Sequence, residues 1–200
     1  MVRIYTKTGD DGTTGLLYGG RVPKDSLVMH INGSVDEAQA VLGVARAECE
    51  PGSELDELLV RLERELYVLM AEVATDPSKR PKLVAGTTLV TADMVTALEA
   101  GIDELIGRFE MPSEFVVPGA NRVSAALDLA RTVVRRAERL AVSLDIDGSE
   151  VRTYLNRLSD LLWAVARWAE GDAHLPARTS PRRGRGSAVP RTDTEQGVQS

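Results

Sequence analysis

The start of the chain gathers glycines, hydroxyl groups and one lysine before any long apolar pattern begins. The segment reads Ile4-Tyr5-Thr6-Lys7-Thr8-Gly9-Asp10-Asp11-Gly12-Thr13-Thr14-Gly15. Glycines let backbone N–H groups approach an anion closely, while lysine and threonine supply a positive charge and hydroxyl donors. The segment lacks the Gly-Lys-Ser/Thr ending of a Walker loop and the strand–helix setting of G-x-G-x-x-G. It therefore predicts a phosphate-binding loop of another kind, with a flexible glycine-rich arm as the alternative.

A second group of charged residues lies on a predicted helix over residues 121–144. Arg131, Arg135 and Glu138 recur at i, i+4 and i+7, which places them within about 60° of one another around a helix. This stripe borders the apolar face, where arginines favour anionic partners. A solvated helix face with ordinary ion pairs is the alternative.

The last predicted helix, over residues 149–170, carries polar residues and a tryptophan opposite its leucines: Asn156, Asp160, Trp163 and Arg167. We expect Trp163 to cover a neighbouring subunit or a ring-shaped ligand, with simple core packing as the alternative. Asn156 both donates and accepts hydrogen bonds, so it is suited either to reading a nucleobase or to capping a turn.

Helical periodicity recurs in five long blocks separated by proline and glycine, and strand signals are weak. The predicted helices cover about 26–49, 53–75, 91–109, 121–144 and 149–170, the first with a possible break at Asn32-Gly33. A short extended piece is expected over 115–117. Short connections between these helices favour an all-α, five-helix up-and-down bundle. We expect residues 1–170 to form one domain and residues 171–200 a flexible tail containing arginine and proline.

Composition excludes several other functions. The net charge of −6 argues against a nucleic-acid binder. The single cysteine, Cys49, excludes an internal disulfide and a cysteine-rich zinc site, and His30 and His174 are too far apart to suggest a metal site. The first residues do not show the basic region, apolar run and small-residue cleavage site of a signal peptide, and no apolar run reaches the ~18 residues of a membrane span. We therefore expect a soluble, cytoplasmic protein with no membrane or nucleic-acid partner.

Five short motifs follow one another in a fixed order. They are Thr6-Lys7-Thr8-Gly9-Asp10-x-Gly12, Arg21-Val22-Pro23-Lys24-Asp25, Phe115-Val116-x-Pro118-Gly119, Arg131-x-x-x-Arg135-Arg136-Ala137-Glu138-Arg139 and Tyr154-Leu155-Asn156-Arg157-Leu158-Ser159-Asp160. With them, residues 3 to about 170 resemble the PduO-type ATP:cob(I)alamin adenosyltransferases. Each motif alone is weak, but five in order are highly specific.

This resemblance implies a homotrimer of five-helix bundles with each active site between neighbouring subunits. It implies that ATP binds with Mg²⁺ at the N-terminal loop and that Co(I) of cobalamin attacks the ribose C5′ carbon, which releases triphosphate and forms adenosylcobalamin. Because Co(I) is itself the nucleophile, the reaction needs no general base or activated serine or cysteine. A reductase and an adenosylcobalamin-dependent acceptor enzyme are the further partners it suggests.

The resemblance also implies roles for individual residues. The nucleotide lies against the loop residues Thr6, Lys7, Thr8, Gly9, Asp10, Thr14, Gly15 and Lys24, and against Arg135, Arg136, Ala137, Glu138, Arg139 and Asn156. Arg131 pairs with Asp36 across the subunit boundary, and Phe115 keeps the lower axial base of the corrinoid away from cobalt. Gly15 departs from the pattern, since relatives often have a hydroxyl residue there.

Two other functions remain open from the sequence. One is a non-catalytic helical bundle that binds a nucleotide or a partner, in which the arginines only make subunit ion pairs. The other is RNA binding by the arginine-rich tail, which the acidic body and the lack of interleaved aromatic residues disfavour.

Overall fold

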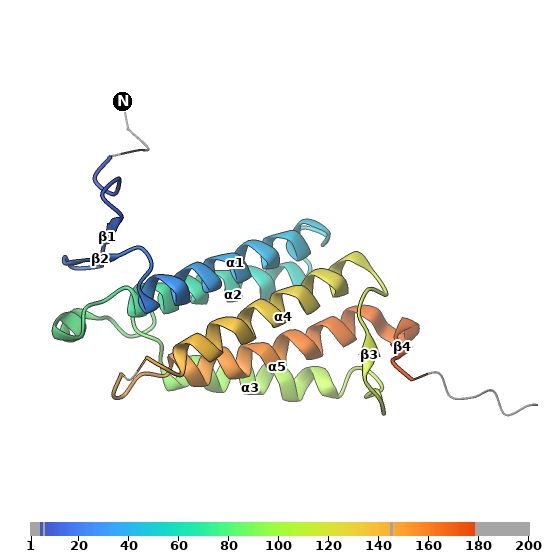
Figure 1. Cartoon of the computed structure of the whole chain (residues 1–200). Coiled ribbons are helices and arrows are strands. Elements are labelled where there is room, and N and C mark those ends of the chain that lie inside the picture. The colour runs from blue at the N-terminus through green and yellow to red at the C-terminus, as the bar shows by residue number, and fades with distance from the viewer. Residues whose placement is uncertain (1–4, 6, 145, 179–200) are drawn as a thin grey trace, which may run out of the picture.

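The computed structural model describes residues 5, 7–144 and 146–178 of the chain. These residues form a helix-dominated bundle, which confirms the predicted fold class at this level (Figure 1). The α-helices of the described residues are α1 (Leu27–Ala47), α2 (Glu54–Val73), α3 (Ala92–Ile106), α4 (Arg122–Ala141) and α5 (Val151–Glu170). None of them has an apolar stretch long enough to cross a bilayer.

Side-chain caps explain where three of these helices begin. Ser53 accepts a hydrogen bond from the backbone N–H of Asp56, and Thr91 accepts one from that of Met94. Asn121 and Ser124 form a reciprocal capping box at the start of α4. The helices start within two residues of the predicted positions, and the first four end two or three residues earlier than predicted. The possible break at Asn32-Gly33 is absent, because α1 runs through it.

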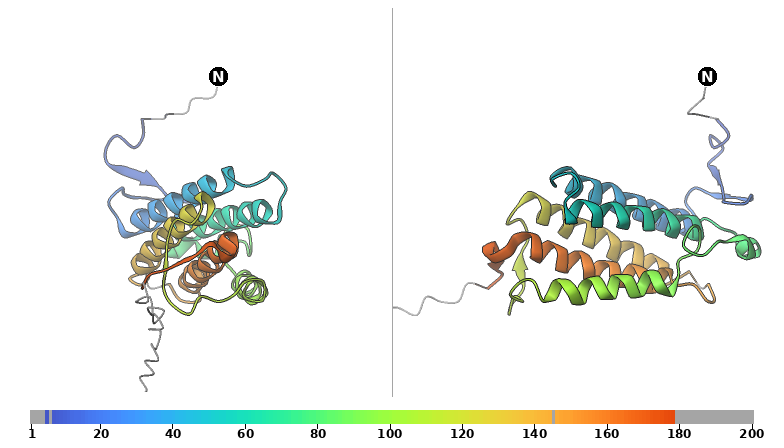
Figure 2. Two further views of the ribbon diagram at one scale, coloured as in Figure 1. Left: turned by 90° about the vertical axis from the view of Figure 1, so that its right-hand side faces the viewer. Right: turned by 180° about the vertical axis from the view of Figure 1, so that it is seen from behind.

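The core lies between layers of helices. Helix α4 packs on α1 and α5, α1 also packs on α2, and α5 also packs on α3 (Figure 2). Leucines at the predicted spacing of three and four are fully buried, among them Leu62, Leu66 and Leu69 of α2 and Leu158 and Leu161 of α5. Helix α4 therefore occupies the centre of the bundle and positions its charged stripe along the seam with α5.

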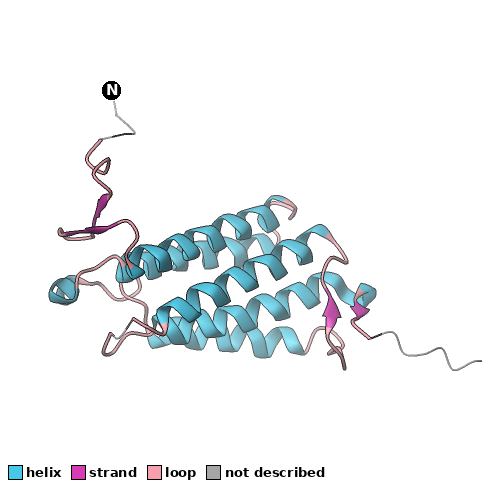
Figure 3. Ribbon diagram, viewed as in Figure 1, coloured by secondary structure: helices cyan, strands magenta, loops and turns pink. Residues whose placement is uncertain are grey.

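Two small antiparallel strand pairs lie at opposite ends of the bundle (Figure 3). Near the N-terminus, β1 (Thr13–Gly15) pairs with β2 (Arg21–Pro23), with Thr14 opposite Val22. This hairpin was not predicted. It is joined to the end of α2, because the N–H of Leu17 donates to the carbonyl of Ala74 at 2.8 Å.

At the other end, β3 (Val116–Val117) pairs with β4 (Leu175–Pro176), and the N–H of Ala177 donates to the carbonyl of Phe115 at 2.6 Å. The extended piece expected over 115–117 is therefore present at Val116–Val117. The expectation of a flexible tail is wrong for residues 171–178, which form a 3₁₀ turn (η2, Gly171–Ala173) and then β4. They are ordered because β4 pairs with β3. Residues 179–200 lie outside the described residues.

A buried carboxylate connects the loops at the hairpin end of the bundle. Glu72 of α2 accepts from Arg80 Nη2 at 3.0 Å and from Ser149 Oγ at 2.6 Å through one oxygen. Its other oxygen accepts from the backbone N–H of Val90 at 2.7 Å. Arg80 lies in a 3₁₀ helix (η1, Pro77–Lys82). One fully buried side chain therefore fixes two connections, α2–α3 and α4–α5, against α2.

Glu72→Gln is expected to lower the free energy of unfolding by about 3 kcal/mol, because it leaves Arg80 without its buried partner and turns an N–H donor toward another donor. Urea unfolding followed by circular dichroism measures the change. Glu57→Gln, an exposed substitution in the first turn of the same helix, should cost less than about 1 kcal/mol. Equal costs for the two variants would contradict the role given to Glu72.

Candidate active site

The N-terminal loop is shaped by two cations from the strand and turn that follow it. Arg21 Nη2 donates to the carbonyl oxygen of Thr8 and to Thr13 Oγ1, both at 2.6 Å. Lys24 Nζ donates to the carbonyl oxygen of Gly9 at 2.7 Å. Pairing of β1 with β2 brings these cations to the loop. The motif contained Arg21, but its structural role in holding the loop backbone was not foreseen.

Backbone and carboxylate geometry further restrict this loop. Gly12 has φ +83°, in the left-handed region that favours glycine, and a Cβ on Gly9 would lie 3.1 Å from Lys24 Nζ. Asp11 Oδ1 accepts from the N–H and the hydroxyl of Thr13 at 2.9 and 2.8 Å. The backbone hydrogen bond first, and the hydroxyl second, lower the pKa of Asp11. The loop is therefore a constrained turn in which the Asp11 carboxylate accepts hydrogen bonds from the loop itself.

Other loop residues with expected roles present their side chains or backbone at the surface. Lys7 has a positive φ of 61°, and its ammonium lies 5.9 Å from the ring centre of Tyr5. Asp10 and Gly15 are exposed and Thr14 is half-buried. Thr6, which we expected to bind phosphate, lies outside the described residues.

Helices α4 and α5 bring a second group of predicted residues together. Asn156 Nδ2 donates to Glu138 Oε1 at 3.0 Å, and Arg157 Nη1 donates to Asn156 Oδ1 at 2.7 Å. Arg157 also donates through Nε to Glu99 of α3 at 2.7 Å, and this hydrogen bond raises the pKa of Arg157. The amide of Asn156 is therefore oriented from both sides, with one N–H of its Nδ2 still open.

The arginines of α4 differ in their partners. Arg136 pairs with Glu37 of α1. In the described part of the chain, exposed Arg135 and Arg139 have no ion pair or hydrogen-bond partner for their side chains, so both guanidinium groups are open to an anion. Ala137 was expected beside the nucleotide. Its side chain instead has no exposed surface and packs in the core.

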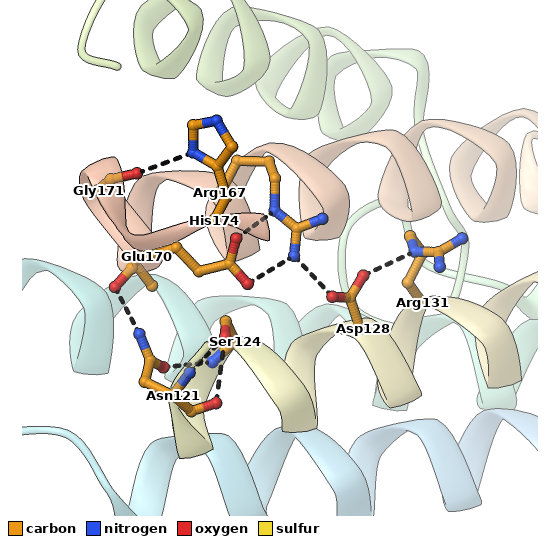
Figure 4. Close-up of polar contacts among 9 residues, drawn as sticks. Asn121, Ser124, Asp128, Arg131, Arg167, Glu170, Gly171 and His174 are labelled. Carbon is orange, nitrogen blue, oxygen red and sulfur yellow. Dashed lines mark hydrogen bonds and ion pairs between the residues drawn. The ribbon is translucent and has the colours of Figure 1, made fainter. Parts of the chain in front are cut away.

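Arg131 begins a row of alternating charges that crosses from α4 to α5 (Figure 4). Its Nε lies 3.3 Å from Asp128 Oδ1, and Asp128 Oδ2 accepts from Arg167 Nη2 at 2.6 Å. Arg167 in turn contacts both carboxylate oxygens of Glu170, at 3.0 and 2.9 Å. The side chains of Asp128 and Arg167 are only 4% and 3% exposed. Two oppositely charged groups are thus buried beside a predicted site residue.

This buried row corrects the expectation that Arg167 lies opposite the leucines of α5. Trp163 is half-buried against the core, and the Arg167 guanidinium lies 5.8 Å from its ring centre. The sequence contained a signal that was not used: Asp128 sits inside the apolar run Ala126-Leu127-Asp128-Leu129-Ala130. A lone carboxylate there requires a buried cation.

Phe115 directly precedes β3, which lies at the opposite end of the bundle from the N-terminal strands β1 and β2 (Figure 1). It is 90% exposed. It borders a pocket of about 490 Å³ whose other lining residues include Glu114, Trp163 and Arg178. Pairing of β3 with β4 places this aromatic ring at the surface instead of in the core.

Asp36 lies on the other flank of α1. It lines a groove of about 560 Å³ between α1 and α2 together with Gln39, Gly43 and Tyr67. The next residue, Glu37, points to α4 through its pair with Arg136. Within the described residues Asp36 has no ion-pair partner, and one chain does not bring it to Arg131.

A single chain therefore assembles only part of the predicted site. The loop, the C-terminal half of α4 and the start of α5 share one end of the bundle, and Phe115 lies at the other (Figure 1). From Arg139 to Arg131 the rise of the helix is roughly 12 Å. The described residues contain no cluster of three or more histidine, cysteine or acidic side chains that could hold a metal ion.

Comparison with known sequences gives a consistent assignment. The sequence model of the family described as Cobalamin adenosyltransferase matches residues 4–169. A corrinoid adenosyltransferase of Citrobacter freundii is 39% identical over 173 residues, which cover 85% of this chain and 96% of that protein. One of Mycobacterium tuberculosis is 37% identical over 180 residues, covering 88% and 92%.

Comparison with solved structures agrees. A phenylalanine-to-histidine variant of a PduO-type ATP:corrinoid adenosyltransferase from Lactobacillus reuteri, complexed with cobalamin and ATP, superposes with a TM-score of 0.75. It is 28% identical, and the match covers 84% of this chain and 91% of that one. An arginine-to-lysine variant complexed with ATP gives a TM-score of 0.73 at 28% identity, covering 84% and 94%.

Proposed function

Since this chain belongs to the cobalamin adenosyltransferase family, we propose that it is a corrinoid adenosyltransferase that transfers the 5′-deoxyadenosyl group of ATP to the cobalt of cob(I)alamin. The observation that carries this function is the set of two open arginines, Arg135 and Arg139, at the same end of the bundle as the constrained glycine loop. The arginines and the glycine loop suit a triphosphate, and membership of the family indicates that cob(I)alamin is the acceptor.

The reaction needs little from the protein beyond positioning and charge. The electron pair of Co(I) attacks C5′, a cobalt–carbon bond forms, and the C5′–O bond breaks with its electron pair leaving on triphosphate. No proton moves in this step, which fits a site without a poised histidine. Mg²⁺ enters with ATP as part of the substrate, and Lys7, Arg135 and Arg139 stabilise the charge that develops on the leaving group.

The order of the site residues along the bundle suggests how ATP and the corrinoid are oriented relative to α4. The phosphates lie at the loop end, near Lys24 and Arg139, and the ribose points along α4 toward Arg131. Phe115 marks the opposite end, so the corrin ring lies between Arg131 and Phe115. Asn156, oriented by Glu138 and Arg157, uses its remaining N–H for the adenine or ribose.

A second copy of the chain completes this arrangement. Asp36 faces the α1–α2 groove, whereas Arg131 faces the α4–α5 seam. The two belong to different flanks, so their pairing requires a neighbouring subunit, as in a closed ring of identical chains with heterologous contacts. A homotrimer is the ring that this family membership favours.

An anaerobic absorbance assay tests the proposed function. Purified protein mixed with MgATP and chemically reduced cobalamin should consume the Co(I) band and produce an alkylated corrinoid, with one triphosphate released per turnover. ATP binding without loss of Co(I) would instead indicate the non-catalytic nucleotide binder. Full activity from a strictly monomeric protein would refute the subunit-boundary site.

The position of β4 leads to a prediction about shortened chains. A chain that ends at Gly171 loses the strand that pairs with β3 and the hydrogen bond to Phe115. Its activity from cob(II)alamin and a reductant should therefore fall, by up to about 10²-fold as for a misplaced site residue. A chain that ends at Arg178 retains both and should keep full activity. Equal activity of the two chains would show that β4 does not position Phe115.

A further inference from the structure

Asp128 carries a carboxylate that is almost completely buried. It lies on the side of α4 that faces α5, and its two oxygens contact different arginines. Oδ1 lies 3.3 Å from Arg131 Nε, and Oδ2 lies 2.6 Å from Arg167 Nη2. Only Arg131, with 26% of its side chain exposed, reaches the surface. The carboxylate therefore connects the protein interior to one surface arginine.

We propose that Asp128 is a positioning residue for Arg131, an inference that rests on the proposed function. Arg131 uses its Nε for Asp128, while both terminal amino groups have no partner among the described residues. A guanidinium group fixed at Nε presents its two terminal N–H₂ groups as a fork, the geometry that binds a carboxylate through two parallel hydrogen bonds. The fork is then available to Asp36 of a neighbouring copy.

The rest of the buried row keeps Asp128 charged and in place. A carboxylate that is 4% exposed requires compensation, and Arg167 supplies a full positive charge at 2.6 Å. Glu170 balances Arg167, the second cation of the row, and the Trp163 ring lies 5.8 Å from the same guanidinium group. The alternating signs leave the row neutral, with its outer end at Arg131.

A purely structural role predicts something different. In that case the row only joins α4 to α5, and removing either carboxylate should have the same consequence. Glu170 offers the matched comparison, because it contacts Arg167 but not Arg131. Both carboxylates lie in the same row and both substitutions replace a charge by an amide of the same shape.

The test combines Asp128→Asn, Glu170→Gln and Arg131→Lys, measured with MgATP and preformed cob(I)alamin and by dissociation of the oligomer on dilution. Asp128→Asn should slow adenosyl transfer about ten- to hundredfold and raise the subunit dissociation constant about tenfold. In the Arg131→Lys background the same substitution should change either quantity less than about twofold, because a lysine has no Nε to fix. Glu170→Gln should lower the thermal unfolding midpoint but leave the transfer rate within about twofold.

Three results would overturn the inference. They are an undiminished effect of Asp128→Asn in the Arg131→Lys background, equal losses of transfer rate in Asp128→Asn and Glu170→Gln, and a wild-type protein that is monomeric. The dissociation measurement does not depend on turnover, so it decides the role of Asp128 even if the wild-type protein transfers no adenosyl group. That last result would instead refute the proposed function.

Discussion

Arg135→Ala is expected to slow adenosyl transfer by about 10²- to 10³-fold, since it removes one preorganised cation from the leaving triphosphate. The folded structure should be unaffected. Arg135 is exposed and makes no ion pair in the described part of the chain, so the free energy of unfolding should change by less than about 0.5 kcal/mol. Anaerobic single-turnover absorbance at saturating ATP measures the rate directly.

Two further variants separate charge from geometry. Arg135→Lys keeps the positive charge but loses the planar fork, and should recover only part of the rate. Arg61→Ala removes an arginine of α2 that is half-buried and pairs with Glu65 of the same helix, and should leave the rate unchanged. Wild-type turnover in Arg135→Ala would show that the triphosphate lies elsewhere.

Phe115→Ala is expected to cause a selective loss that depends on the oxidation state of the supplied corrinoid. We propose that the ring excludes the lower axial ligand from cobalt, which leaves a four-coordinate Co(II) that is easier to reduce. A change of about 60 mV in a one-electron potential alters the reducible fraction tenfold, so activity from cob(II)alamin with a reductant should fall about tenfold or more. From preformed cob(I)alamin the loss should stay below about threefold.

Because Phe115 is exposed, its substitution should change activity without changing stability. With 90% of the residue exposed, its truncation removes little packing, and the thermal unfolding midpoint should not move. Phe115→Leu keeps an apolar side chain in the same place and should retain most of the activity from cob(II)alamin. Equal losses from both oxidation states would exclude the axial-ligand role.

The sequence was informative where local rules determine structure. Apolar spacing in α2 and capping by Ser53, Thr91 and Asn121 were enough to place helices, because both depend on residues within one or two turns. The same periodicity placed Glu138 at the border of the apolar face, but it did not predict the hydrogen bond that Glu138 accepts from Asn156. These features need no knowledge of distant contacts.

Other features depend on partners far along the chain, which periodicity does not reveal. Strands β1 and β4 span three and two residues, and they exist because β2 and β3 pair with them. Arg167 was expected at the surface, since a lone arginine on a helix is usually solvated. Its burial requires Asp128, which lies 39 residues earlier. The pairing of Asp36 with Arg131 stays a prediction, because it involves two chains.

Because α4 has no break, it restricts where residues can be inserted into this protein. The helix is one stiff rod that carries Arg131, Arg135 and Arg139 on a single face. In the proposed arrangement, helical rise therefore sets the separation between triphosphate and corrinoid, and changes in loop length at either end leave it intact. Inserting one residue between Arg131 and Arg135 would instead turn the two groups apart by about 100°, so length variation is confined to the loops.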